Sequence, residues 1–179
     1  MITQENTTLV LIDVQGNLAE AMYGKEALFD NLERLIKGVQ VLNLPIILTE
    51  QVPEKLGRTV PRLAELLNDI VPIEKNTFSC CGDESFISEI KKNGRGQLLI
   101  AGIEAHVCVY QTVRDLLNLG YEVHVVVDAI SSRRLENKEL ATGKMMKRGA
   151  EITSVEMALF ELLEKAEGEE FRQIIKIVK

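Results

Sequence analysis

The fold is decided by the stretch QLLIAGIEAHVCVYQTVRDLLNLGYEVHVVV, residues 97–127. An apolar run of strand length, Gln97–Gly102, is followed by an amphipathic run of helix length, about His106–Leu119, which Gly120 closes. The next apolar run, Tyr121–Val127, is the most β-rich segment of the chain. Both strand-like runs are predominantly apolar, and Leu98–Gly102 and Val125–Val127 are uninterrupted, as is typical of strands that helices cover on both faces of a parallel sheet. The stretch therefore predicts a β-α-β unit.

The same alternation of strand-like and helix-like runs extends in both directions from this unit. It predicts a three-layer α/β/α sandwich with right-handed crossovers. We found no internal repeat and no linker, so residues 1–179 are expected to form a single domain. The further strands are expected at Thr8–Asp13, Pro45–Thr49, Ile73–Lys75 and Glu151–Thr153, and the further helices at Glu26–Leu42, Arg62–Leu67, Asp83–Lys92, Asn137–Arg148, Val155–Lys165 and Glu169–Val178.

Composition excludes several classes of function. Hydrophobic residues make up 46% and charged residues 27% of the chain, which indicates a globular protein. The formal net charge is −6, only 4% of residues are aromatic and there is no Trp, so a nucleic-acid partner is not expected. An odd number of cysteines, three, does not suit a disulfide framework and favours free thiols.

The sequence shows no targeting or membrane signal. The opening residues 1–6 lack a basic segment followed by a long apolar run, so we expect no signal peptide. No apolar stretch approaches the roughly 18 residues that a membrane span requires. Free thiols and the missing signals together predict a cytoplasmic location.

Charged and nucleophilic residues gather where the predicted strands end. In a parallel sheet ligands bind at the carboxyl ends of the strands, where Asp13, Lys75 and Cys108 are expected. A carboxylate can accept a thiol proton, and a lysine ammonium can stabilise the thiolate. The residues alone leave two readings open, a catalytic set, or a structural ion pair beside an ordinary buried cysteine.

Several motifs resemble the isochorismatase-like (cysteine hydrolase) superfamily, from about Leu9 to Leu163. The likeness to its branch of isochorismatase-domain-containing proteins rests on Leu48–Pro53 and Leu56–Pro61. The motifs that carry the superfamily likeness are Leu11–Gln15, Lys75 with Thr77–Ser79, Ala101–Val109 with Thr112, and Val125–Ala129 with Ser131–Arg133.

The resemblance implies a Rossmann-like sandwich with a six-stranded parallel sheet and a catalytic triad. The triad residues fall on Asp13, Lys75 and Cys108. The resemblance also implies a cis peptide bond at Ile103–Glu104, and an oxyanion hole formed by the amides of Glu104 and Cys108. These groups would together stabilise a tetrahedral intermediate.

Gln15, Phe78 and Ile103 are expected to contact the substrate. Gln15 could instead cap a loop, and Phe78 could instead pack in the core. For Glu50, Gln51 and His106 the sequence leaves open whether they line a pocket or an interface.

No metal or cofactor is expected. Nicotinamidases of this superfamily bind a metal after the second strand through an Asp and nearby His residues. Here Thr49–Pro53 contains no His, and the only histidines are His106 and His124. Two separated histidines cannot form a His-rich cluster, which predicts a metal-free hydrolase.

The resemblance implies hydrolysis of a small carboxamide or related C–N bond through a Cys108 thioester. Two alternatives remain open, hydrolysis of a vinyl ether such as isochorismate with the Asp as acid, or a non-catalytic oligomeric scaffold that retains the triad. The resemblance also implies a homo-oligomer, a dimer or larger.

Overall fold

The computed structural model describes residues 1–179 and contains one six-stranded sheet in the order β3-β2-β1-β4-β5-β6. All neighbouring strands are parallel, which confirms the predicted α/β fold. The strands are β1 (Thr7–Ile12), β2 (Ile46–Gln51), β3 (Ile73–Lys75), β4 (Gln97–Ile103), β5 (Glu122–Ser131) and β6 (Glu151–Thr153).

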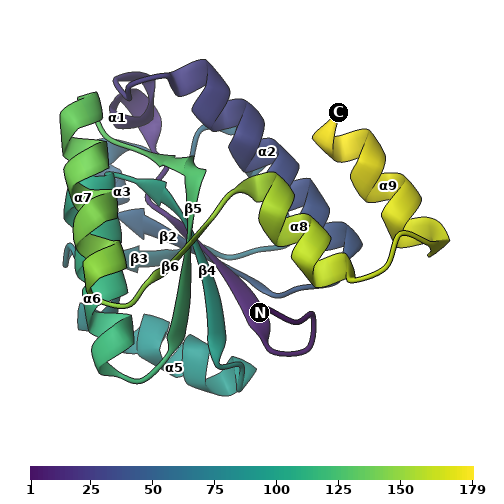
Figure 1. Ribbon diagram of the computed structural model, residues 1–179. Helices are drawn as coiled ribbons and strands as arrows, with labels where there is room; N and C mark the ends of the chain where they lie inside the picture. The colour runs from purple at the N-terminus through teal and green to yellow at the C-terminus, as the bar shows by residue number, and fades with distance from the viewer.

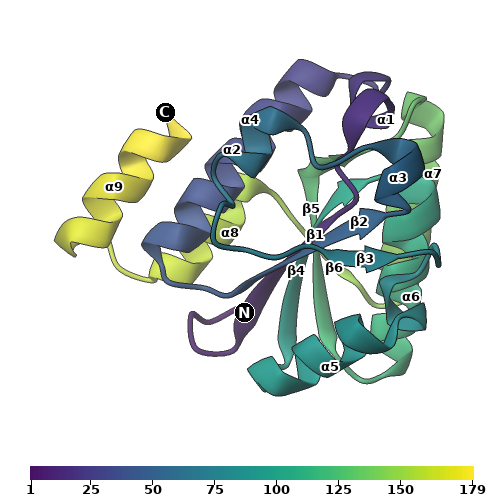
Figure 2. The ribbon, with the colours of Figure 1, turned by 180° about the vertical axis from the view of Figure 1, so that it is seen from behind.

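Helices cover both faces of the sheet, as Figures 1 and 2 show from opposite sides. One face carries α2 (Lys25–Val41) and α8 (Val155–Leu163), and α9 (Gly168–Val178) lies outside these two. The other face carries α5 (Glu84–Asn93), α6 (Tyr110–Asn118) and α7 (Leu135–Lys147). None of the helices is both long and apolar enough to span a bilayer.

The strands contribute apolar side chains to two separate hydrophobic cores, one on each face of the sheet. In β1, Leu9 and Leu11 belong to the core under α2 and α8, whereas Val10 and Ile12 belong to the core under α5 and α6. All four side chains are fully buried. This two-sided burial explains why the strand is continuously apolar.

Short helices connect the elements at the carboxyl edge of the sheet. The sequence predicts a helix that overlaps α4 (Pro61–Ala64) but not α1 (Gly16–Glu20) or α3 (Pro53–Leu56), which are too short to show an apolar period. The remaining single turns are η1 (Cys80–Gly82) and η2 (Ala105–Val109).

Several boundaries differ from expectation. The strand expected to end at Thr49 continues to Gln51, and the short helix expected to reach Leu67 ends at Ala64. The helix expected from His106 starts as a π-helical turn, η2, before it continues as α6. The strand expected to end at Val127 continues to Ser131, so Asp128 lies inside β5. Its carboxylate accepts a hydrogen bond of 2.9 Å from the Val155 amide at the start of α8, which is a structural task.

Two unusual backbone positions bring the ends of β1 and β4 together. Gly102 has φ +118°, and a Cβ there would lie 2.1 Å from the Ile12 carbonyl oxygen, so only glycine fits. Asp13 follows β1 with φ 52°, a left-handed conformation that Asp tolerates better than most residues. The chain thereby turns out of β1 directly beside the end of β4.

Candidate active site

A buried ion pair forms the base of the site. Lys75 Nζ lies 2.6 Å from Asp13 Oδ2, and the side chains are 0% and 2% exposed. Thr49 donates to Asp13 Oδ1 at 2.7 Å, and Lys75 also donates to the Thr77 carbonyl at 3.1 Å. A buried ion pair is stable only when such further hydrogen bonds satisfy both charges.

The ion pair keeps Lys75 protonated. Burial lowers the pKa of Lys75, but the adjacent Asp13 carboxylate outweighs burial, and the net pKa is raised above its ordinary value. The lysine is therefore a permanent cation at neutral pH, suited to orienting a carboxylate and stabilising a neighbouring anion.

Gln51, the last residue of β2, links the ion pair to the thiol. Its Oε1 accepts hydrogen bonds from Lys75 Nζ at 3.1 Å and from Cys108 Sγ at 3.2 Å. The residue is only 9% exposed. The sequence leaves open whether Gln51 lines a pocket or an interface, and in the structure its side chain lies between Lys75 and Cys108.

Cys108 lies on the π-helical turn η2 and is 7% exposed. Burial raises the pKa of its thiol well above the ordinary range, the Asp13 carboxylate raises it further, and Lys75 opposes both. The resting group is thus a neutral thiol, and it needs a base before it can act as a nucleophile. The nearby carboxylate of Asp13 is the group that can supply one.

The turn before Cys108 presents a free backbone donor. The peptide bond Ile103–Glu104 is cis, as the sequence analysis expected. The Glu104 amide donates to no backbone or side-chain acceptor, although the residue is only 8% exposed. Its carboxylate accepts from Arg133 Nε at 3.0 Å, which ties the residue to the loop after β5. A buried, unpaired N–H suits an incoming oxyanion.

Gln15 braces the site from behind. Its side chain is fully buried, its Oε1 accepts from the Gln51 amide at 2.6 Å, and its Nε2 donates to the carbonyls of Gln51 at 3.2 Å and Gly57 at 2.6 Å. All these partners are main-chain atoms. In this structure Gln15 therefore holds the end of β2 in place and has no donor left for a substrate.

The other two expected substrate contacts, Ile103 and Phe78, differ in how exposed their side chains are. Ile103 is fully buried in the core at the end of β4, whereas the Phe78 side chain is 55% exposed just beyond Lys75. Phe78 is thus free to meet a ligand or a partner. Ile103 can influence a ligand only through the backbone that it shares with Glu104.

Two further residues that the sequence left open have structural partners. The Glu50 carboxylate accepts from Thr59 N at 2.7 Å and from Arg58 at 2.8 Å, and these contacts lower its pKa against the opposing effect of burial. His106 Nδ1 lies 2.9 Å from Ser132 Oγ. Glu50 therefore fastens the loop before α4, and His106 fastens the loop after β5.

No residues in the structure form a metal-binding constellation. No group of three or more His, Cys, Asp or Glu side chains is placed to hold an ion. Glu50 is the carboxylate that lies where nicotinamidases bind their metal, at the end of the second strand. Its Oε1 already accepts hydrogen bonds from the amide and the hydroxyl of Thr59. The residues present thus do not fit the metal of the nicotinamidases.

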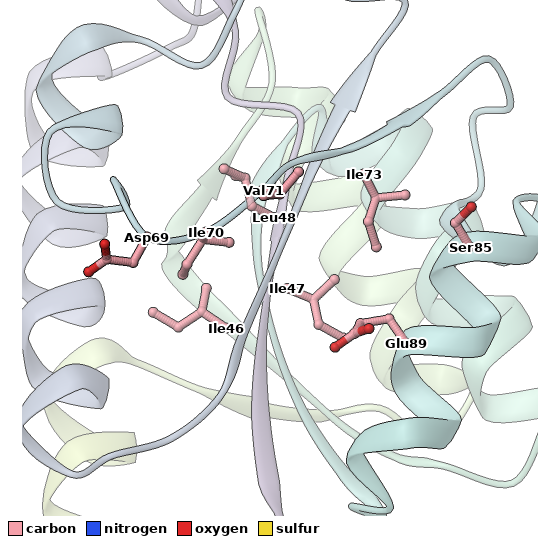
Figure 3. Close-up of a pocket in the computed structure, with 9 residues that line it drawn as sticks. All are labelled: Ile46, Ile47, Leu48, Asp69, Ile70, Val71, Ile73, Ser85 and Glu89. Carbon is pink, nitrogen blue, oxygen red and sulfur yellow. The ribbon is translucent and has the colours of Figure 1, made fainter.

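An apolar cavity lies away from this chemistry (Figure 3). It opens beside the first half of β2, at Ile46–Leu48, and α5 contributes Ser85 and Glu89 to it. Its polar side chains are two carboxylates and one hydroxyl, with no thiol and no cation. It therefore cannot carry out the reaction that the carboxyl edge suggests.

Known proteins resemble the chain along most of its length. Isochorismatase domain-containing protein 2A of Mus musculus is 36% identical over 183 residues, which cover 99% of this chain and 85% of the relative.

Among solved structures, a MAR1 ribonuclease from Caenorhabditis elegans is 35% identical with a TM-score of 0.93, over 99% of this chain and 91% of that one. YcaC from Pseudomonas aeruginosa, described with hexane-2,5-diol and covalent acrylamide, is 25% identical with a TM-score of 0.92, over 98% and 90% of the two chains. The isochorismatase domain matches residues 7–157. The chain therefore belongs to the isochorismatase domain family.

Proposed function

We propose that the chain is a cysteine hydrolase that cleaves a small carboxamide through a thioester on Cys108. One observation carries the proposal, the continuous hydrogen-bonded path from Asp13 through Lys75 and Gln51 to the buried thiol. Burying charged and polar groups together is costly, so such a network points to a function for the groups that it holds in place. A thiol, a carboxylate and a permanent cation are the groups that acyl transfer requires.

The acylation step uses the resting protonation states. Asp13 accepts the proton of Cys108 as the sulfur attacks the carbonyl carbon, and the C=O electron pair moves onto oxygen. The Glu104 and Cys108 amides donate to that oxyanion. Each well-placed donor lowers the barrier by about 3–4 kcal/mol. The intermediate collapses, the C–N bond breaks, and Asp13 returns the proton to the departing ammonia.

The deacylation step reuses the same groups. Asp13 takes a proton from water, which attacks the thioester, and the oxyanion again lies on the two amides. Collapse breaks the C–S bond, releases the carboxylic acid and restores the protonated thiol. Lys75 keeps its proton throughout and orients the carboxylate.

The test is ammonia release from a panel of small carboxamides and ureido compounds. We expect Cys108→Ala to abolish turnover and Cys81→Ala to retain it, because Cys81 lies outside the hydrogen-bonded path. Intact mass should reveal an acyl adduct that Cys108→Ala lacks.

The panel also separates the alternatives. Vinyl-ether hydrolysis with Asp13 as the acid predicts turnover that survives Cys108→Ala. A scaffold predicts no turnover and an unreactive thiol. The name of the Caenorhabditis elegans relative adds RNA to the panel, and cleavage of RNA alone would contradict the amidase proposal.

We further propose that residues 1–179 act as one hydrolase domain, in the cytoplasm, as a homo-oligomer. Three free cysteines suit a reducing compartment. The exposed Phe78 and Tyr23 supply apolar surface that a second copy could cover. Light scattering of the purified chain tests the assembly, and a monomeric mass at working concentration would contradict it.

A further inference from the structure

The orientation of the Gln51 amide follows from its neighbour. Lys75 Nζ carries only donors, so the oxygen of Gln51, and not its nitrogen, must face the lysine. That same oxygen also accepts from Cys108. The Nε2 group is thereby turned away from the ion pair, and it donates to no protein acceptor. The residue is nine-tenths buried, but Thr8 Oγ1 is the only fully buried side-chain polar atom without a partner, so Nε2 remains accessible to solvent.

The amide is also rigidly held. Gln15 bonds both the N–H and the carbonyl of Gln51, and β3 pairs with β2 so that Gln51 and Lys75 are in register. A side chain fixed at its backbone and at its oxygen has little freedom to redirect its nitrogen. The unpaired donor is therefore preorganised beside the thiol.

We propose that Gln51 Nε2 is the substrate-recognition donor of the site, and that it binds an oxygen acceptor a few bonds from the carbon that Cys108 attacks. The inference rests on the proposed function and narrows its substrate class to compounds with a carbonyl or carboxylate oxygen at that distance. Oε1 is 3.2 Å from Sγ, so Nε2 lies within roughly 5.5 Å of the sulfur given ordinary amide dimensions. A hydrogen bond of about 2.9 Å then reaches a small group bonded to sulfur.

The site should reject compounds that lack this acceptor. Such a compound would bury Nε2 without a partner, which weakens transition-state binding. We expect a loss of about 10–100-fold in reaction rate at Cys108, the range that an unpaired buried donor implies.

Alkylation of Cys108 tests the inference without turnover. Iodoacetamide and allyl iodide are of similar size, but only the first carries a carbonyl oxygen two bonds from the reacting carbon. The ratio of their second-order rate constants, divided by the same ratio for glutathione, reports recognition and cancels changes in thiol pKa. The site of alkylation is read by peptide mass, with Cys81→Ala to reduce background.

We expect the ratio to favour iodoacetamide in the wild type and to fall about 10-fold or more in Gln51→Met, which keeps the side-chain length without a donor. Gln51→Glu, of nearly the same shape, should lower the ratio as well and provides a second variant if Gln51→Met does not fold. An unchanged ratio in a folded variant whose Cys108 is still alkylated would overturn the inference and leave the proposed function standing. A wild-type thiol that reacts with neither reagent would overturn the inference and the proposed function together.

Discussion

The two halves of β2 contrast sharply. The first half, Ile46–Leu48, is apolar and borders the open cavity of Figure 3. The second half, Thr49–Gln51, is polar, and its side chains form hydrogen bonds to Asp13, Thr59, Lys75 and Cys108. The first half of β2 thus borders a cavity, whereas the second half contacts the candidate reactive groups. The contrast shows that converging polar groups identify the site here, whereas the presence of a cavity does not.

The largest expected effect comes from breaking the ion pair. Lys75→Met should destabilise the protein by about 3–5 kcal/mol, because it leaves the buried Asp13 carboxylate unpaired. The control, Ile47→Val in the apolar half, should cost only about 0.5–1.5 kcal/mol. Urea unfolding measures the stability of both variants. Equal losses would show that the polar and apolar halves of β2 do not differ in their contribution to stability.

A smaller effect is expected at Thr49, where the polar half begins. Thr49→Val keeps the shape but removes the donor to Asp13 Oδ1, which should cost about 1.5–3 kcal/mol since the acceptor is charged and buried. The same variant should slow alkylation of Cys108 if Thr49 helps to orient the base. A variant as stable as the wild type would show that the carboxylate finds another donor.

Alkaline pH should lower the stability of the protein through the thiol of Cys80, which lies beside the polar half of β2. Burial raises the pKa of Cys80, whose Sγ lies 3.8 Å from Thr49 Oγ1, to about 11. The unfolded thiol ionises near its ordinary pKa, about 8.5. Stability is therefore complete below that pH and is lost as pH rises toward the folded pKa, since the unfolded chain releases its proton first.

Cys80→Ala isolates this contribution. The stability difference between the wild type and Cys80→Ala should narrow by about 2 kcal/mol between pH 8 and pH 10, when followed by urea unfolding at each pH. A constant difference would mean that the Cys80 thiol titrates alike in both states.

The smallest effect belongs to the rim of the apolar cavity. Val71 is 87% exposed, so Val71→Ser should change stability by less than about 0.5 kcal/mol and leave hydrolysis and Cys108 alkylation unchanged. A clear loss of turnover would mean that the cavity takes part in the reaction, and the contrast between the two halves would fail.

The sequence predicted that the main residues of the site lie together, because the order of the strands is enough to place them at one edge of the sheet. Asp13, Lys75 and Cys108 each follow or end an apolar run, and parallel strands bring such ends to one edge. The helix expected at Asp83–Lys92 is likewise present as α5, and the Asp83 side chain caps its start by accepting from Ser85 N and Phe86 N.

The linking contacts could not be predicted in the same way. Gln51 and Glu50 are adjacent on β2, so their side chains point to opposite faces, and only the structure shows that Gln51 meets the thiol while Glu50 meets Arg58. The Gln15 side chain also bonds the end of β2 at Gln51 and the turn at Gly57, which lie 36 and 42 residues further along the chain. Such pairings arise from tertiary packing and leave no periodic pattern in the sequence.

Gly102 has a consequence for how this scaffold can vary. A single added carbon at that position would lie 2.1 Å from the Ile12 carbonyl oxygen, one residue before Asp13. Any side chain there would force the strand that carries the base away from the strand that leads to the nucleophile. The spacing between the two reacting groups thus depends on the missing side chain of a third residue, and we expect new specificities to come from the surrounding loops.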